Sequence, residues 1–257
     1  MKAVILAGGL GTRLSEETGV RPKPMVEIGG RPVLWHIMRI YAHYGIKDFV
    51  VLCGYKADVI KEYFLNYTHH QSDFTIDLGK NKITWMRPSA EDWRVTLLDT
   101  GVDTMTGGRL KRARHAIGDD TFCLTYGDGL SDVNIGELIA FHRKSGAVCT
   151  VTAAEPPGRF GVLGLEPDSS LVTAFREKDG QDVGLVNSGF FVCEPSVFDL
   201  IDHDSMSWEL EPLRRLVEKG QLAAYRHRGF WQPMDTLRDK VVLEQLWSTG
   251  KAPWKVW

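Results

Sequence analysis

The sequence lacks the excess of positive charge that would mark a nucleic-acid-binding protein. Its 31 lysines and arginines are balanced by 33 aspartates and glutamates, so the formal net charge is −2 at pH 7. A protein that binds nucleic acid by neutralising phosphates usually carries a basic surplus. We therefore expect no nucleic-acid partner, and positive charge for a small anionic ligand must be local.

Cysteine is scarce, and its spacing excludes the common zinc sites. Cys53, Cys123, Cys149 and Cys193 form no Cys-x-x-Cys pair and no Cys/His set with zinc-ligand spacing. Each lies in an apolar, strand-like run. This pattern predicts small buried side chains in a reducing compartment.

Long hydrophobic runs are absent as well. Lys2 is followed by five apolar residues before Gly8, which is too short for a signal peptide. No run approaches the roughly 20 apolar residues of a membrane span. We expect a cytoplasmic protein with no membrane partner.

The composition that is present, 43% hydrophobic and 25% charged residues over 257 positions, is typical of a globular domain. In the first half, short apolar runs alternate with segments of helical periodicity. We expect strands at 2–7, 48–53 and 121–126 and helices at 33–44, 57–67 and 134–145, the last capped by Asn134. Such βαβ units predict a Rossmann-like three-layer α/β/α fold with a mostly parallel mixed sheet.

From about residue 147 the expected strands become shorter. They lie at 148–154, 162–166, 171–176 and 189–193, and helices are expected at 207–219 and 236–248. Without repeats or a low-complexity linker, 1–257 is predicted to be one domain.

Glycines follow the first expected strand, at Gly8, Gly9 and Gly11. Glycines here leave backbone N–H groups free to bind phosphates. A dinucleotide fingerprint is excluded because its last glycine position is Leu14, and no Walker string occurs. A tight turn alone would also explain these three glycines.

A lysine between two prolines, farther along the chain than these glycines, supports the interpretation of the glycine loop as an anion-binding site. Pro22 and Pro24 restrict the backbone around Lys23 and so fix one cation in place. With Arg13 nearby in sequence, the pattern indicates an anion site rather than a plain turn.

Together these motifs are similar to those of the sugar-phosphate nucleotidyltransferases, which join a nucleoside triphosphate and a sugar 1-phosphate. The resemblance rests on LAGGLGTRL at 6–14, RPKPM at 21–25, YGD at 126–128, FREKD at 175–179 and VNSGFFV at 186–192. It therefore spans most of the chain.

Two further runs resemble the cytidylyltransferase branch of this family, which makes CDP-glucose from CTP and glucose 1-phosphate. They are TGGRL at 106–110 and FWQPMDT at 230–236. The resemblance implies a role in making precursors of surface polysaccharide such as the O-antigen of lipopolysaccharide. Transfer of a thymidylyl or uridylyl group, or non-catalytic nucleotide-sugar binding, remain alternatives.

The implied reaction is an in-line attack of the sugar phosphate on the α-phosphorus of CTP. Because a sugar phosphate is already an anionic nucleophile, the protein needs to position two anions and neutralise their charge. This agrees with the absence of a Ser-His-Asp or Cys-His set near the glycine motifs.

The resemblance assigns most site residues. Arg13, Lys23 and Asp128 are expected to be catalytic, with Arg13 on the β- and γ-phosphates and Lys23 at the α-phosphate or sugar phosphate. The nucleotide site is expected to comprise Leu6, Ala7, Gly8, Gly9, Leu10, Gly11, Thr12, Arg13, Lys23, Thr104, Arg109 and Asp128. Thr104 and Arg109 are candidates for contacting cytosine, although Arg109 could instead belong to a solvated basic helix face.

A magnesium site is expected at two aspartates. Asp128 follows the third strand, where ligands gather in open α/β sheets, and carboxylates suit Mg²⁺. Asp235 is the second candidate ligand. It lies four residues after Trp231, whereas the family usually places this aspartate two residues after a tryptophan, and a helix N-cap before Thr236 is the alternative.

The sugar phosphate is expected to bind Glu177, Lys178, Asn187 and Gly189. The family's usual Glu-Lys-Pro reads Glu-Lys-Asp here. With the change of strand pattern near residue 147, we expect the domain to comprise a nucleotide-binding part at 1–146, a sugar-phosphate-binding part at 147–235, and a C-terminal helix and tail at 236–257.

The resemblance also implies a homo-oligomer, with a hexamer as the specific expectation. Three tryptophans towards the C-terminal end and one in an earlier apolar segment are candidates for subunit contact, and core packing would explain them equally. They are Trp208, Trp247, Trp254 and Trp257.

Overall fold

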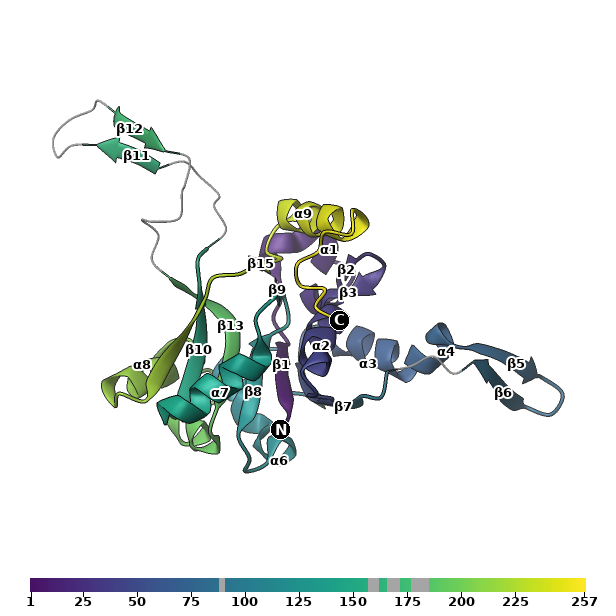
Figure 1. The fold of residues 1–257 in the computed structure, drawn as a ribbon. Coiled ribbons are helices and arrows are strands. Elements are labelled where there is room, and N and C mark those ends of the chain that lie inside the picture. Colours follow the sequence, from purple (N-terminus) through teal and green to yellow (C-terminus); the bar gives the residue numbers. More distant parts are fainter. Residues whose placement is uncertain (88–90, 157–161, 166–171, 177–184) are drawn as a thin grey trace.

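A seven-stranded sheet forms the centre of the computed structural model (Figure 1), which describes residues 1–87, 91–156, 162–165, 172–176 and 185–257. Its strand order is β14 (Leu222–His227), β10 (Cys149–Ala154), β13 (Val186–Cys193), β8 (Phe122–Tyr126), β1 (Ala3–Ala7), β4 (Asp48–Cys53) and β7 (Arg94–Asp99). Neighbouring strands are parallel, except that β13 is antiparallel to both β8 and β10. The predicted α/β fold with a mostly parallel sheet is confirmed.

Helices cover both faces of this sheet. On β1, Ile5 packs in the core shared with α2 (Val33–His43), α7 (Ile135–Ser145) and α9 (Leu237–Ser248), whereas Val4 packs with α5 (Thr106–Arg112) and α8 (Glu211–Glu218). Because side chains alternate between the faces of a strand, a strand covered on both faces is apolar throughout. The fully apolar β1 is thus explained by its central place.

The expected strands and helices of the first half agree with the structure within a few residues at each end. α3 spans Ala57–Leu65, and the side chain of Asn134 caps α7 by accepting from the backbone N–H of Glu137 at 3.0 Å. The shorter elements are η1 (Thr12–Leu14), α1 (Ser15–Thr18), η2 (Lys23–Met25), β2 (Glu27–Ile28), β3 (Arg31–Pro32), α6 (Arg114–Ile117), β9 (Gly129–Ser131), η3 (Pro195–Leu200) and β15 (Trp231–Pro233).

Within the seven-stranded sheet, the two strands that the sequence patterns did not predict, β7 and β14, lie at its two edges. An edge strand has a neighbouring strand on one side only, so more of its residues contact solvent. β7 and β14 accordingly contain partly exposed and charged residues and lack a clear apolar run. β10, β13 and β14 extend the same sheet as β1, so the second half of the chain shares the sheet of the first.

Two hairpins project from the body of the molecule (Figure 1). One pairs β5 (Asp73–Asp77) with β6 (Lys82–Arg87) and follows α4 (Tyr67–Gln71). The other pairs β11 (Val162–Leu165) with β12 (Val172–Arg176).

The four cysteines are unpaired and buried, as expected. Trp208 and Trp254 are fully buried, so core packing explains both. Trp254 Nε1 donates to His36 Nδ1 at 3.3 Å, and Trp247 lies edge-on to the same imidazole. The C-terminal segment is therefore anchored on α2. Among the described helices, none has the length and apolar character needed to cross a membrane.

Candidate active site

The carboxyl ends of β1, β4, β7 and β8 meet at one edge of the sheet, which we call the carboxyl edge. β1 leads into Gly8, β4 into Gly54 and β8 into Gly127 and Asp128. Open α/β sheets bind their ligands outside this edge. The predicted glycine loop and the predicted metal ligand Asp128 therefore lie at the same edge.

Lys23 is held between two carboxylates. Its Nζ donates to Asp128 Oδ2 at 2.6 Å and to Asp235 Oδ1 at 2.5 Å, and its side chain is 11% exposed. Burial alone lowers the pKa of Lys23, but the charges and hydrogen bonds of Asp128 and Asp235 outweigh it, so the net pKa is raised. Lys23 therefore stays protonated across the ordinary pH range.

Backbone pairing explains why residues 105 and 212 positions away from Lys23 converge on it. β9 and β15 are antiparallel with Gly129 opposite Pro233, and Met234 N donates to the carbonyl of Asp128 at 2.8 Å. Asp128 directly precedes β9, and Asp235 lies two residues after the end of β15. Because the two strands are antiparallel, both aspartates lie at the same end of the pairing. The β9–β15 pairing therefore brings Asp235, four residues after Trp231, to the ammonium of Lys23.

Asp235 does not cap the helix that follows it. Thr236 is the N-cap of α9, and its side chain accepts from the backbone N–H of Asp239 while Asp239 Oδ2 accepts from that of Thr236. This capping box leaves the Asp235 carboxylate directed at Lys23. The N-cap alternative for Asp235 is wrong.

Gly127 allows the RPKPM segment to lie against the end of β8. A Cβ on Gly127 would come within 2.8 Å of the carbonyl of Leu6 and 3.0 Å of the Pro24 ring. Gly127 N also donates to Leu6 O at 2.9 Å. This close contact brings Lys23 to the carboxylate of Asp128.

Arg109 is buried beneath the glycine loop, with 4% of its surface exposed. Its Nη2 donates to the carbonyls of Gly8 and Val102, both at 3.0 Å. Its Nη1 donates to the Thr100 hydroxyl at 2.8 Å and the Gly101 carbonyl at 2.6 Å, with a longer contact to Cys53 O. One guanidinium thus joins the ends of β1, β4 and β7.

This arrangement explains two of the glycines. A Cβ on Gly8 would lie 2.3 Å from Arg109 Nη1, and one on Gly54 would lie 2.2 Å from it. The solvated-face alternative is wrong for Arg109, although Lys111 and Arg112 on the same helix are exposed. Contact of Arg109 with cytosine remains a prediction.

The rest of the loop presents backbone to solvent. Gly9 is exposed and Leu10 is 52% exposed, while Gly11 has a φ of +65° and accepts from Leu14 N at 3.0 Å. Leu6 and Ala7 are the buried end of β1, and Thr12 and Arg13 begin η1. Thr104 is buried behind Gly101, 7% exposed. Gly9 and Leu10 are therefore open to solvent, while Arg109 holds the preceding Gly8 through its carbonyl.

Tyr126 joins the residues predicted for the sugar phosphate to the carboxyl edge. Asn187 Nδ2 donates to the Tyr126 hydroxyl at 3.1 Å, and Gly189, with a φ of +83°, lies where a Cβ would meet the Tyr126 ring at 2.4 Å. Burial and the neighbouring Glu209 raise the pKa of Tyr126, so its hydroxyl stays protonated. Tyr126 was not predicted as a site residue, although it begins the YGD motif. The other two candidates, Glu177 and Lys178, lie outside the described residues.

Asp128 and Asp235 suit a magnesium ion, although no group of three potential His, Cys, Asp or Glu ligands occurs in the part of the chain that the structure describes. Magnesium is usually held by one or two carboxylates together with substrate phosphates and water. Two carboxylates at the carboxyl edge, near the glycine loop, match the protein part of that donor set.

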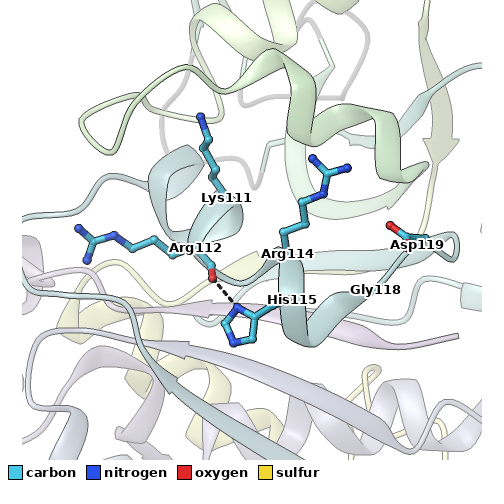
Figure 2. A pocket seen from close by; sticks show the side chains of 6 residues that line it. All are labelled: Lys111, Arg112, Arg114, His115, Gly118 and Asp119. Carbon is cyan, nitrogen blue, oxygen red and sulfur yellow. Dashed lines mark hydrogen bonds between the residues drawn. The ribbon is translucent and has the colours of Figure 1, made fainter.

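A basic hollow lies on the surface around the end of α5 and α6. Figure 2 shows its lining residues, Lys111, Arg112, Arg114, His115, Gly118 and Asp119. Lys2, which precedes β1, donates to the carbonyls of Ala116 and Ile117, which places α6 at the amino end of the sheet. Acidic residues and carbonyls of 199–204 bind its three cationic side chains. Arg112 also donates from Nη1 to the carbonyl of Thr100 at 2.9 Å, so this lining residue reaches the carboxyl end of β7.

A doubly wound sheet with a glycine loop and a lysine between two aspartates at its carboxyl edge is the arrangement of an enzyme that handles nucleotide phosphates. The nucleotidyl transferase family model matches residues 2–239, and the chain belongs to this family. Over full length of both chains it is 58% identical to glucose-1-phosphate cytidylyltransferase of Salmonella typhi and 46% identical to a probable glucose-1-phosphate cytidylyltransferase of Bacillus subtilis.

Among solved structures, HddC from Yersinia pseudotuberculosis is similar, with a TM-score of 0.70, 25% identity, and coverage of 96% of this chain and 99% of that one. A further structure of HddC is described as a complex with GMP-PN. UDP-glucose pyrophosphorylase shares the fold, with a TM-score of 0.70 at 15% identity.

Proposed function

We propose that this protein transfers the cytidylyl group of CTP to α-D-glucose 1-phosphate, giving CDP-glucose and pyrophosphate. The observation that carries the proposal is the placement of Lys23, Asp128 and Asp235 beside the glycine loop. The choice of base and sugar is supported by 58% identity to a glucose-1-phosphate cytidylyltransferase over the whole chain.

In this proposal the protein positions two anions and neutralises their charge. The outward backbone of Gly9 to Gly11 receives the nucleotide, and Arg13 binds the β- and γ-phosphates that leave as pyrophosphate. Lys23 offers its ammonium to the α-phosphate or the attacking sugar phosphate. Because the attacking oxygen is already ionised, no side chain has to remove a proton.

Magnesium is the proposed cofactor, held by Asp128 and Asp235. When bound, Mg²⁺ would draw negative charge from phosphate oxygens as the leaving group departs. Asn187 and Gly189, with Glu177 and Lys178, are proposed to hold the glucose 1-phosphate, next to the hydroxyl of Tyr126.

The decisive experiment measures pyrophosphate release across a panel of nucleoside triphosphates and sugar 1-phosphates. We expect the highest kcat/KM with CTP and glucose 1-phosphate, and no release when Mg²⁺ is removed by a chelator. A preference for UTP or dTTP would identify one of the alternative activities. Binding without turnover in every pair would identify a nucleotide-sugar-binding protein.

We also propose that the protein is a homo-oligomer, a hexamer by the family resemblance. The β5–β6 hairpin supports subunit contact, because Phe74 and Ile76 pair with Trp85 and Ile83 to give one apolar face of partly exposed side chains. An isolated hairpin with an apolar face in water is marginally stable, and exposed apolar patches commonly mark interfaces.

We propose a cytoplasmic location because the cysteine thiols are free and buried. Cys149 Sγ and Cys193 Sγ are hydrogen-bonded at 3.6 Å on neighbouring strands, and both thiols are free. Buried cysteines without disulfide pairing are typical of proteins in a reducing compartment.

A further inference from the structure

Lys23 lies where a cation bound to both predicted metal ligands would lie. Its Nζ is the shared hydrogen-bond donor to Asp128 Oδ2 and Asp235 Oδ1, at 2.6 and 2.5 Å. The two carboxylates are 31% and 18% exposed, so water screens them only partly. The ammonium thus offsets the negative charge that would otherwise attract a divalent ion to this pair.

The backbone of Lys23 is fixed, whereas its side chain has an alternative direction. Val26 N donates to Lys23 O at 3.1 Å and Met25 N to Pro22 O at 2.8 Å, which closes the η2 turn. The Lys23 Cβ lies only 3.3 Å from the position of a Cβ built on Gly11. The four-carbon stem therefore starts beside the glycine loop and ends at the carboxylates, and rotation about its bonds can redirect the ammonium to a phosphate at the loop.

Charge decides when this rotation is favourable. An ammonium and Mg²⁺ held by the same two carboxylate oxygens would repel each other strongly at such short range. A phosphate bound at the glycine loop gives the ammonium a second anionic partner. Redirecting Lys23 then leaves both carboxylates to the metal.

We infer that Lys23 occupies the cation position between Asp128 and Asp235 in the free protein and competes there with the divalent metal, until a substrate phosphate draws its ammonium away. This inference rests on the proposed metal site. It makes metal binding and phosphate binding mutually reinforcing, since each ligand favours the same position of one lysine side chain.

The test is divalent-metal binding to the full-length protein without nucleotide, using Mn²⁺ followed by electron paramagnetic resonance. Lys23→Met removes the ammonium and retains an apolar stem, and we expect it to bind Mn²⁺ about tenfold more tightly than the unsubstituted protein. Lys23→Gln is neutral but keeps an N–H donor, which guards against misfolding of the first variant. Its Mn²⁺ affinity should also rise.

Coupling is measured by repeating the titration with CMP, whose single phosphate chelates the metal only weakly by itself. CMP should tighten Mn²⁺ binding to the unsubstituted protein and have a smaller effect on Lys23→Met. Lys47→Met is the matched control, because Lys47 also pairs with an aspartate, Asp92 at 2.6 Å, but precedes β4 at the amino edge. Its Mn²⁺ affinity should be unchanged.

Two results distinguish a failure of the competition by Lys23 from a failure of the proposed metal site. If Asp128→Asn and Asp235→Asn abolish Mn²⁺ binding while folded Lys23→Met and Lys23→Gln bind it no more tightly than the unsubstituted protein, competition by Lys23 is wrong and the metal site stands. If the aspartate variants bind Mn²⁺ normally, the metal site is wrong and the inference falls with it.

Discussion

The guanidinium of Arg109 lies directly behind Gly8 and donates to its carbonyl at 3.0 Å. The same group holds the ends of β4 and β7 through Cys53, Thr100 and Gly101. The glycine loop is therefore supported by a buried cation on its inner side, while its outer side is open to a ligand. This relationship makes opposite predictions for two adjacent glycines.

Gly8→Ala should destabilise the protein and Gly9→Ala should not. A Cβ on Gly8 would lie 2.3 Å from Arg109 Nη1, whereas a Cβ on Gly9 would meet no atom within 4 Å. Forcing a buried, hydrogen-bonded side chain aside costs about 1–3 kcal/mol of the free energy of unfolding. Denaturant unfolding of both variants measures the difference, and equal stabilities would contradict the role given to Arg109.

Arg109→Ala should raise the KM for CTP much more than the KM for glucose 1-phosphate. The reason is that the five acceptors of Arg109 all lie at the nucleotide loop or the strand ends beside it, including Gly8 O and Val102 O. Steady-state kinetics with each substrate varied in turn provides the measurement. Equal increases in both KM values would contradict the assignment of Arg109 to nucleotide binding.

Short-range patterns in the sequence were sufficient for the central strands and for the residue types at the carboxyl edge. β1 is predictable because it is buried on both faces and therefore wholly apolar. The edge strand β7, with half-exposed residues and charges at both ends, lacks that signal. Propensity describes local neighbours, and β7 forms because it pairs with β4.

The contacts within the site depend on parts of the chain far apart in sequence. Gly8 and Gly11 look alike in a motif, yet one makes room for Arg109 and the other adopts a positive φ. Likewise nothing local shows that Lys23 bridges Asp128 and Asp235, because β9–β15 pairing brings them together. These relationships required the fold.

Asp128→Ala and Lys23→Ala should each lower kcat severely, by about 100-fold or more, while the protein stays folded. Both groups are proposed to act at the reacting phosphate, and they pair with each other outside the two apolar core clusters, so we expect their loss to leave the core intact. Single-turnover kinetics at saturating substrates and Mg²⁺ is the measurement, with circular dichroism to verify folding. Asp120→Ala, an exposed carboxylate before β8, serves as the control. Near-native kcat in either site variant would remove its assigned role.

Trp85→Glu should reduce the oligomeric state. Trp85 is 38% exposed on the apolar face of the β5–β6 hairpin, opposite Phe74. A charge at the centre of a subunit contact has to lose its hydration, which disfavours association. Light scattering after size exclusion measures the mass. Thr84→Glu, on the other face of the same strand, is the matched control and should leave the mass unchanged.

Stability should fall between pH 7 and pH 5 because of His36. This imidazole is fully buried, with Nε2 at 2.8 Å from the Ile28 carbonyl and Nδ1 accepting from Trp254 Nε1. Burial lowers its pKa from 6.5 to about 4. Between those values the unfolded chain binds a proton that the folded protein excludes, so stability is complete above pH 6.5 and declines as the pH falls towards 4. At pH 5 the loss is about 2 kcal/mol.

His36→Gln isolates this contribution, because glutamine can donate to the Ile28 carbonyl but does not titrate. The variant should be less stable than the unsubstituted protein at pH 7, since it loses part of the ring packing against Trp247 and Trp254. Its free energy of unfolding should nevertheless change less between pH 7 and pH 5. Urea unfolding of both proteins at both pH values measures how steeply the free energy of unfolding depends on pH in each. Other groups titrate in both proteins alike, so the difference between the slopes belongs to His36. Parallel slopes would mean that the buried imidazole is protonated as easily in the folded protein as in the unfolded chain.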